Sequence, residues 1–300
     1  MAFSMPSPSD SSATLFDTGS PTSFTPPPFD PTSIFNVNGL VVVITGGATG
    51  IGLMMATALE SNGAIVYIIG RRGHMLEKAA EEHSFQRYGN ILTMECDVTS
   101  RDDLLTVAEA VRARHGYIDL LINNAGIARN LYAHPLPSPT PQATNFSGPP
   151  SPPASPSMGP TIPSIKAFQS ALWDTGSPED FAETFATNVT AVYYTTVAFL
   201  DLLHQGNIRQ QRLTTLAGSG MPRPPFHTSQ VLSVSSSGSF RLDPKILSPS
   251  YTLSKTACTH LGKLLANLLA PWGIRSNVLA PGVWPSGKAK LLLVLLPEWD

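Results

Sequence analysis

The chain has 300 residues, of which 42% are hydrophobic and 13% are charged, and its formal net charge is −2 at pH 7. The balanced charge offers no concentrated basic face for nucleic acid, and two cysteines without a histidine cluster predict neither a disulfide framework nor a metal site. No apolar run reaches the ~18 residues of a membrane span, so we expect a cytoplasmic protein without membrane or nucleic-acid partners.

Proline is concentrated in two segments, residues 1–34 and 131–165, which together hold 18 of the 28 prolines and only three charged residues. The Ser/Thr/Pro-rich leader 1–34 has no hydrophobic periodicity and is predicted to be disordered. The sequence between and after these segments, up to residue 286, is rich enough in Val, Ile, Leu and Ala to form one folded domain.

Strands and helices alternate along the first part of this domain. A continuous β-branched run at 40–45 is typical of a strand that is buried on both faces. The pattern then predicts helices at 51–60, 75–83 and 102–114, and further strands at 64–69, 91–96 and 118–123. This alternation predicts right-handed βαβ units, and therefore a Rossmann-like, doubly wound parallel sheet in a three-layer α/β/α domain.

The insertion 131–165 contains no Asp, Glu, Lys or Arg, and its P-x-x-P spacings favour polyproline II segments. We predict a disordered Pro-rich excursion. Docking of an SH3- or WW-like partner and phosphorylation at its Ser-Pro steps stay open as alternatives.

Regular structure is predicted to resume at Ser177, a helix cap that is followed by proline and two acids. One long helix is expected to about residue 203, and polar residues 205–230 are expected to form a loop. A strand at 231–235, a helix at 251–269 and a strand at 274–279 complete the predicted elements.

The segment between the first strand and its helix reads TGGATGIG at 45–52. In a dinucleotide-binding turn Gly46 would permit the tight bend, Gly50 would let the backbone approach a pyrophosphate, and Gly52 would let the helix pack on the strand. The expected cofactor contacts in this turn are Gly46, Thr49, Gly50, Ile51 and Gly52.

The second strand ends in Arg71-Arg72, where an NAD site usually places an acid for the ribose 2′-hydroxyl. Two guanidinium groups suit a 2′-phosphate instead, so the sequence favours NADP(H) over NAD(H). Arg72 has an alternative interpretation, in which it solvates the start of the following helix.

Tyr251 and Lys255 share one face of a predicted helix at i, i+4 spacing. A free tyrosine has a pKa near ~10, and a nearby ammonium would lower that pKa by stabilising the phenolate. Tyr251 is then a candidate general acid for carbonyl reduction. Alone, the Tyr-x-x-x-Lys pattern is common in helices.

Further motifs accompany this pair in order: Cys96-Asp97-Val98, Asn123-Asn124-Ala125-Gly126, a helical Asn188, Ser236 and Pro281-Gly282. Together they resemble the short-chain dehydrogenase/reductase family, particularly fungal members with extended loops. The resemblance covers about 35–286, interrupted by the insertion. It implies a ketone–alcohol oxidoreductase that uses NADP(H) and acts on a small molecule, with a homo-oligomer, dimer or tetramer, as a further possibility.

The resemblance also implies roles for individual residues. Ser236 would hold the substrate oxygen, Tyr251 would exchange a proton with it, and Lys255 would bind the nicotinamide ribose and lower the Tyr251 pKa. Asn188 would hold a water that links Lys255 to solvent. Further cofactor contacts are expected at Asp97, Val98, Asn124, Ala125, Gly126, Pro281, Gly282 and Val283.

Two of these assignments keep alternatives. Several serines lie close together, so Ser235 is the second choice for the catalytic serine and Ser237 the third. Asn188 has a second interpretation as a polar helix residue that caps a loop.

After Ser286 the family pattern stops, and residues 287–300 form an atypical tail where a helical lid and a seventh strand would be expected. We expect an altered C-terminus, from a frameshift or an unspliced intron. A transcript that continues the family pattern would support this, and one that encodes this tail would refute it. Without a lid the nicotinamide would be wetter, so a nucleotide-binding pseudoenzyme or interaction protein with little turnover is the alternative function.

Overall fold

A six-stranded parallel sheet runs through the part of the chain that the computed structural model describes, which is residues 35–84, 89–139, 163–216, 227–242 and 248–282. Its strand order is β3-β2-β1-β4-β5-β6, so the chain winds outward from β1 in both directions and the predicted doubly wound sheet is confirmed. The strands are β1 Val41–Thr45, β2 Ile65–Gly70, β3 Ile91–Glu95, β4 Leu120–Asn123, β5 Gln230–Val234 and β6 Arg275–Leu279.

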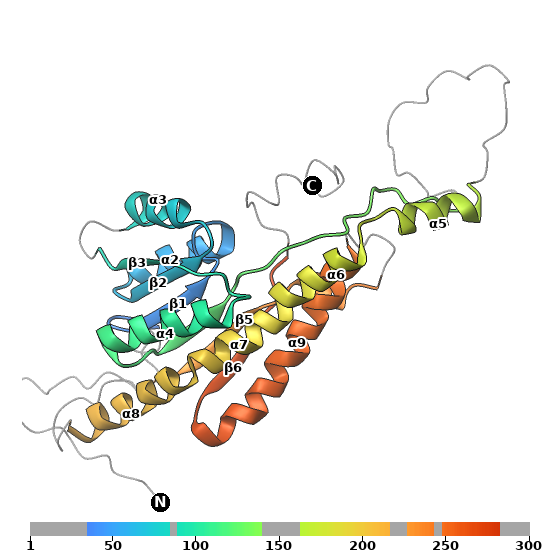
Figure 1. The fold of residues 1–300 in the computed structure, drawn as a ribbon. Helices are drawn as coiled ribbons and strands as arrows, with labels where there is room; N and C mark the ends of the chain where they lie inside the picture. Colours follow the sequence, from blue (N-terminus) through green and yellow to red (C-terminus); the bar gives the residue numbers. More distant parts are fainter. Residues whose placement is uncertain (1–34, 85–88, 140–162, 217–226, 243–247, 283–300) are drawn as a thin grey trace, which may run out of the picture. The chain divides into compact units, whose positions relative to one another are not determined.

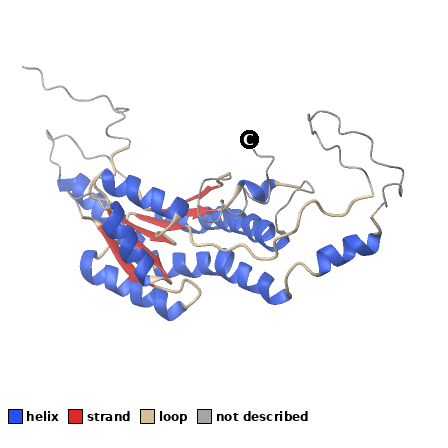
Figure 2. Ribbon diagram, turned by 90° about the horizontal axis from the view of Figure 1, so that it is seen from above, coloured by secondary structure: helices blue, strands red, loops and turns tan. Residues whose placement is uncertain are grey.

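Helices cover both faces of this sheet, which gives the three layers that Figure 2 shows. Alternate residues of each central strand supply the two cores. Val42 and Ile44 of β1 pack in the core with α2 (Gly50–Ser61) and α3 (Gly73–His83). Val41 and Val43 pack in the other core, whose helices are α4 (Arg101–His115), α7 (Ala191–Ala198), α8 (Leu200–Leu216) and α9 (Pro249–Leu269).

The predicted long helix is built from consecutive pieces that follow one another closely, with α9 alongside (Figure 1). α6 (Pro178–Phe185) leads into the π-helical turn η1 (Ala186–Thr190), then α7 and α8. α8 continues to Leu216, so the prediction of a loop from residue 205 is wrong. The helix continues because Asn207 is buried and donates to the backbone oxygens of Trp272 and Gly273, both at 3.1 Å.

A further helix, α5 (Ile165–Trp173), was not predicted, and it begins at the residue where the insertion was expected to end. Ser164 caps it by accepting the Ala167 N–H at 3.2 Å. The leader 1–34, residues 140–162 of the insertion and the tail 287–300 lie outside the described residues. Two short 3₁₀ turns, η2 (Ser237–Phe240) and η3 (Ala270–Trp272), complete the elements.

The carboxyl ends of the parallel strands meet at one edge of the sheet, where ligands of such folds bind. The glycine-rich turn, the Asn124 turn and the residues after β5 therefore share this edge. Within the described residues, no helix combines the length and the apolar character that crossing a membrane requires.

Candidate active site

The glycine-rich turn between β1 and α2 is folded tightly. Gly46 has a φ of +65° and donates its N–H to Ile69 O at 2.7 Å. A Cβ on Gly52 would lie 2.4 Å from Gly46 O. The start of α2 can therefore lie against the turn after β1 only because position 52 is glycine. α2 begins at Gly50 with neither a side-chain cap from Thr49 nor an acid in its first turn. Its first N–H groups are therefore suited to an anion.

A second turn, after β4, is bonded directly to the first. Thr45 Oγ1 accepts the N–H groups of Asn124 and Ala125, each at 2.9 Å. The Asn124 carboxamide donates to Thr45 O at 2.9 Å and to Gly46 O at 3.1 Å. These four bonds hold the two turns in one fixed arrangement at the edge of the sheet.

The end of β2 presents two exposed arginines. Arg71 and Arg72 follow the strand directly, and Arg72 occupies the N-cap position of α3 without a side-chain cap bond. A carboxylate that was not predicted as part of the site lies beside them. Glu95 ends the neighbouring strand β3, and its Oε2 lies 2.8 Å from where a Cβ on Gly73 would be. Two positive charges and one negative charge therefore stand at this corner of the site.

Asp97 and Val98 follow β3 in a turn whose geometry is fixed by side chains. Asp97 Oδ1 accepts the N–H of Thr99 at 2.9 Å and its hydroxyl at 2.7 Å. The Asp97 N–H in turn donates to Asp103 Oδ2 at 2.9 Å, and Val98 is buried. The carboxylate of Asp97 is thereby held at the end of β3.

Asn188 is fully buried in the π-helical turn η1, and its carboxamide makes three hydrogen bonds. Its Oδ1 accepts the Ile127 N–H at 2.9 Å, while its Nδ2 donates to Ile127 O and to Ser254 Oγ, both at 2.9 Å. A Cβ on Gly126 would lie 3.1 Å from Asn188 Oδ1 and 3.3 Å from Lys255 Nζ. The structure thus brings Gly126, Asn188 and Lys255 together.

Tyr251 meets one of the three candidate serines. The Ser236 side chain, which follows β5, lies close enough to the Tyr251 hydroxyl to lower the pKa of that group. Ser235 is buried and donates to Lys255 O at 2.8 Å, so it faces the backbone of α9, and Ser237 is exposed. The geometry therefore favours Ser236 over both alternatives.

Burial raises the pKa of Tyr251 above its ordinary value of 10.0, and the nearby Ser236 hydroxyl opposes this rise. Lys255 Nζ lies 5.8 Å from the centroid of the Tyr251 ring and donates to Val234 O at 2.7 Å. The net direction is upward because removal of the phenol from water is the largest influence on its pKa. A lowering contribution from Lys255 stays a prediction.

The last predicted contacts follow β6. Pro281 O accepts the Ser237 N–H at 2.8 Å, which ties this segment to the serines after β5. Among the residues that the structure describes, none comes within 4 Å of where a Cβ on Gly282 would be. Val283 lies outside the described residues.

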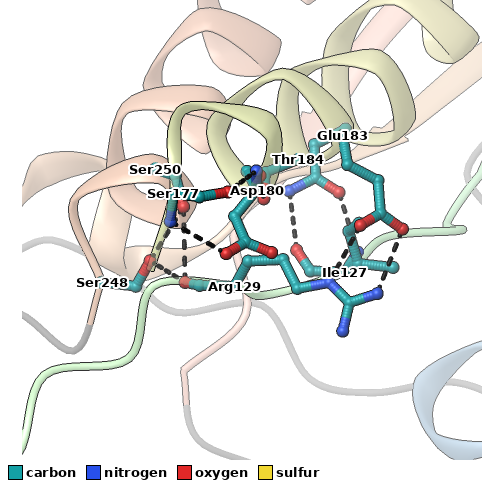
Figure 3. Close-up of polar contacts among 9 residues, drawn as sticks. Ile127, Arg129, Ser177, Asp180, Glu183, Thr184, Ser248 and Ser250 are labelled. Carbon is teal, nitrogen blue, oxygen red and sulfur yellow. Dashed lines mark hydrogen bonds and ion pairs between the residues drawn. The ribbon is translucent and has the colours of Figure 1, made fainter. Parts of the chain in front are cut away.

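Several polar residues near Tyr251 were missed from the sequence, and Figure 3 shows them. Arg129, after β4, forms a two-pronged pair with Glu183 of α6, both bonds measuring 3.1 Å. Ser248 and Ser250 at the start of α9 both donate to Arg129 O. The Ser248-Pro249 pair is a recognisable helix start. Nothing in the sequence indicates its bond to Arg129, because 119 positions separate the two residues.

Comparisons with known proteins agree with this geometry. A family model described as short chain dehydrogenase matches residues 40–144. Short-chain dehydrogenase/reductase VdtF of Byssochlamys spectabilis is 42% identical over 255 residues, which are 83% of this chain and 75% of that protein. Short-chain dehydrogenase/reductase PhomF of Diaporthe leptostromiformis is 38% identical over 273 residues, 88% of this chain and 78% of that protein.

Solved structures share the fold at lower identity. A 3-ketoacyl-(acyl-carrier-protein) reductase from Brucella melitensis, complexed with NADH, has a TM-score of 0.62 at 22% identity and covers 86% of this chain and 82% of its own. The RhlG/NADP active-site complex of Pseudomonas aeruginosa has a TM-score of 0.59 at 21% identity and covers 87% of this chain and 79% of its own. The extent of the curated matches decides the assignment: this chain belongs to the short-chain dehydrogenase/reductase family of oxidoreductases.

Proposed function

We propose that the protein is an NADP(H)-dependent enzyme that interconverts a ketone and a secondary alcohol, with Tyr251 as the general acid/base. The observation that carries this proposal is that the Ser236 hydroxyl lies close enough to the Tyr251 hydroxyl, at the carboxyl edge of the sheet, to lower the pKa of Tyr251. Two neighbouring hydroxyls are suited to bind one substrate oxygen between them. The buried Asn188 and Lys255 lie on the same side of Gly126.

The residues present fit a dinucleotide. No side chain caps the start of α2 and no acid stands in its first turn, so its first N–H groups suit a phosphate. When bound, the cofactor supplies or accepts the hydride. The fold itself accommodates either form, since one solved structure of this fold is a complex with NADH and another is a complex with NADP. The preference for NADP(H) rests on the exposed Arg71 and Arg72.

In this proposal Ser236 holds the substrate oxygen while Tyr251 gives or takes its proton. Lys255, buried and bonded to Val234 O, binds the nicotinamide ribose, and Asn188 holds a water that links Lys255 to solvent. The further cofactor contacts proposed are Thr49, Gly50, Ile51, Asp97, Val98, Asn124, Ala125, Gly126, Pro281, Gly282 and Val283.

The alternative, a nucleotide-binding protein without turnover, differs in what happens after NADPH binds. The assembled Tyr251–Ser236 pair favours an enzyme over this alternative. The domain limits, the cytoplasmic location and the homo-oligomer stay predictions. Sedimentation equilibrium tests the homo-oligomer. The exposed Leu253, Leu264 and Leu268 of α9 are the residues to substitute in that test.

The test measures NADPH binding by fluorescence and NADPH consumption with a panel of ketones that includes diacetyl. We expect turnover in the unmodified chain and a loss on the order of 100-fold or more in Tyr251→Phe, with NADPH binding retained. Turnover that survives the substitution would refute the role of Tyr251. NADPH binding without any turnover would support the alternative.

The same binding assay tests the cofactor choice. Arg71→Ala should weaken NADPH binding about tenfold or more and leave NADH binding nearly unchanged, because only NADPH carries the 2′-phosphate. Glu95→Gln is the matched change at the end of the neighbouring strand. It should strengthen NADPH binding, because it removes a negative charge near the negative 2′-phosphate. Equal losses for both cofactors in Arg71→Ala would contradict a 2′-phosphate contact.

A further inference from the structure

A closed circuit of hydrogen bonds surrounds the backbone of Tyr251 and includes residues that the proposed function does not use. Both the N–H and the C=O of Tyr251 are bonded to serine hydroxyls. The circuit passes from those serines through the segment after β4 and through the π-helical turn η1. All of its side-chain members come from buried positions.

The first half of the circuit starts at the Tyr251 N–H. It donates to Ser248 Oγ at 3.0 Å, and the Ser248 hydroxyl donates onward to Arg129 O at 2.5 Å. Ser248 has no exposed surface, so its hydroxyl forms its hydrogen bonds with protein groups and not with solvent. Ser250, equally buried, adds a longer bond of 3.3 Å to the same carbonyl.

The second half starts at the Tyr251 C=O. The Ser254 hydroxyl donates to it at 2.8 Å and accepts from Asn188 Nδ2 at 2.9 Å. Asn188 also forms hydrogen bonds with both the N–H and the C=O of Ile127, which stands two residues before Arg129. The short strap Ile127–Arg129 therefore joins the two halves and closes the circuit.

A side-chain pair anchors the strap from outside. The Arg129 guanidinium is bonded twice to the Glu183 carboxylate on α6, and both side chains are about half exposed. An exposed pair contributes little stability by itself, about 0–1 kcal/mol. Its two parallel bonds nevertheless tie the strap Ile127–Arg129 to α6.

We propose that Ser248, Ser254 and Arg129 are positioning residues that set the place of the Tyr251 hydroxyl through its backbone. This inference rests on the proposed function of Tyr251. A tyrosine side chain has only two rotatable torsions before its rigid ring. A shift of its backbone therefore moves the hydroxyl by a similar distance. Displacements of about 1 Å at a reacting group lower rates by up to ~100-fold.

The test compares Ser248→Ala, Ser254→Ala and the double variant, with NADPH and diacetyl as substrates. We expect each single change to lower kcat on the order of tenfold, while the KM for diacetyl and the Kd for NADPH stay within about twofold. Because both serines act through one circuit, the double variant should lose little more than the worse single variant. Ser276→Ala is the matched control, since it removes a 3.0 Å hydroxyl–carbonyl bond to Gly262 of the same helix, far along from Tyr251.

Full kcat in either single variant, additive losses in the double, or an equal loss in Ser276→Ala would overturn the inference. A separate measurement keeps it distinct from the proposed function. If the unmodified chain reduces no ketone, amide hydrogen exchange at Tyr251 decides. Ser254→Ala leaves the Ser248 cap of that amide intact, so faster exchange than in Ser276→Ala supports the circuit, and equal exchange refutes it.

Discussion

Tyr251 experiences two opposing influences whose balance sets the pH range in which it can work. Burial favours the neutral phenol and raises its pKa, whereas the neighbouring Ser236 hydroxyl favours the phenolate and lowers it. Reduction of a ketone requires the protonated phenol as a donor, and oxidation of an alcohol requires the phenolate as an acceptor. In the proposed reaction, the raised pKa would therefore favour reduction at neutral pH.

Replacing Ser236 tests this balance. In Ser236→Ala the lowering contribution is lost, so the pKa of Tyr251 should rise further and the alkaline limb of the kcat–pH profile for reduction should move to higher pH. The rate itself should fall by about 100- to 1,000-fold, because a donor to the developing oxyanion is also removed. Profiles measured with NADPH and diacetyl report both effects.

The neighbouring Ser237 provides the comparison, because it is exposed and stands one position further along. Ser237→Ala should leave both the rate and the profile unchanged. If Ser237→Ala instead reproduces the loss and Ser236→Ala does not, the serine assignment is off by one position.

At the scale of elements, the site depends on how closely the start of α2 approaches the turn after β1. The approach is possible because glycine at position 52 has no Cβ. A Cβ there would lie 2.4 Å from both Gly46 O and Asn124 Nδ2. The same carboxamide holds the β4 turn against the β1 turn. One added methyl group would therefore disturb three segments together.

Gly52→Ala should weaken NADPH binding by more than about tenfold and lower the free energy of unfolding by about 1–3 kcal/mol, because backbone atoms must move to admit the methyl group. Fluorescence titration and urea unfolding measure the two effects. Gly70→Ala is the stability control, since a Cβ there meets no atom of the described part of the chain within 4 Å and its φ is not positive. Equal unfolding free energies in the two variants would contradict the close approach.

The elements also show which parts of the fold a sequence can predict. The β-branched run of β1 indicates a buried strand wherever it occurs, and the strands were predicted within a few residues. The second half of α8 was missed because its polar residues are stabilised by partners elsewhere, such as the Ser229 N–H that donates to Asn207 Oδ1 at 2.7 Å. Local pattern contains no information about such contacts.

The site divides in the same way. Gly46, Gly52, Tyr251 and Lys255 belong to short motifs whose spacing indicates chemistry. Ser248 and Arg129 act on Tyr251 through bonds between distant segments, and the direction of the Tyr251 pKa shift depends on burial. Neither property is visible before the chain is folded.

At the scale of the whole molecule, Asp119 joins the three central strands at their starting ends. Its Oδ2 accepts the Val41 N–H at 2.9 Å, its N–H donates to Val41 O at 2.8 Å, and its C=O accepts the Gln230 N–H at 3.0 Å. Burial raises the pKa of this carboxyl, against opposing contributions that include the Val41 bond, Arg209 and His227. The carboxylate is therefore ionised at a cost to folding.

The sign of the pH dependence follows from this shift. Between the ordinary pKa of 3.8 and the raised value, the folded chain binds more protons at Asp119 than the unfolded chain does. The free energy of unfolding must therefore fall as the pH rises through that window. Asp119→Asn keeps an oxygen for the Val41 N–H and removes the charge, so its stability relative to the parent should increase as the pH is raised from about 4 to 7.

Asp103 provides the opposite case on the same sheet edge as the site. The Asp97 N–H and the Ser100 hydroxyl lower its pKa, so its contribution to stability is present above its ordinary pKa of 3.8 and is lost as the pH falls through the lowered value. Asp103→Asn should therefore be less stable than the parent at neutral pH and approach it in acid. Urea unfolding follows Asp119→Asn from about pH 4 to 7 and Asp103→Asn from neutral pH down to below 3.8, and the two differences from the parent should change with pH in opposite directions. A pH-independent difference for Asp119→Asn would show that its carboxyl does not titrate abnormally in the fold.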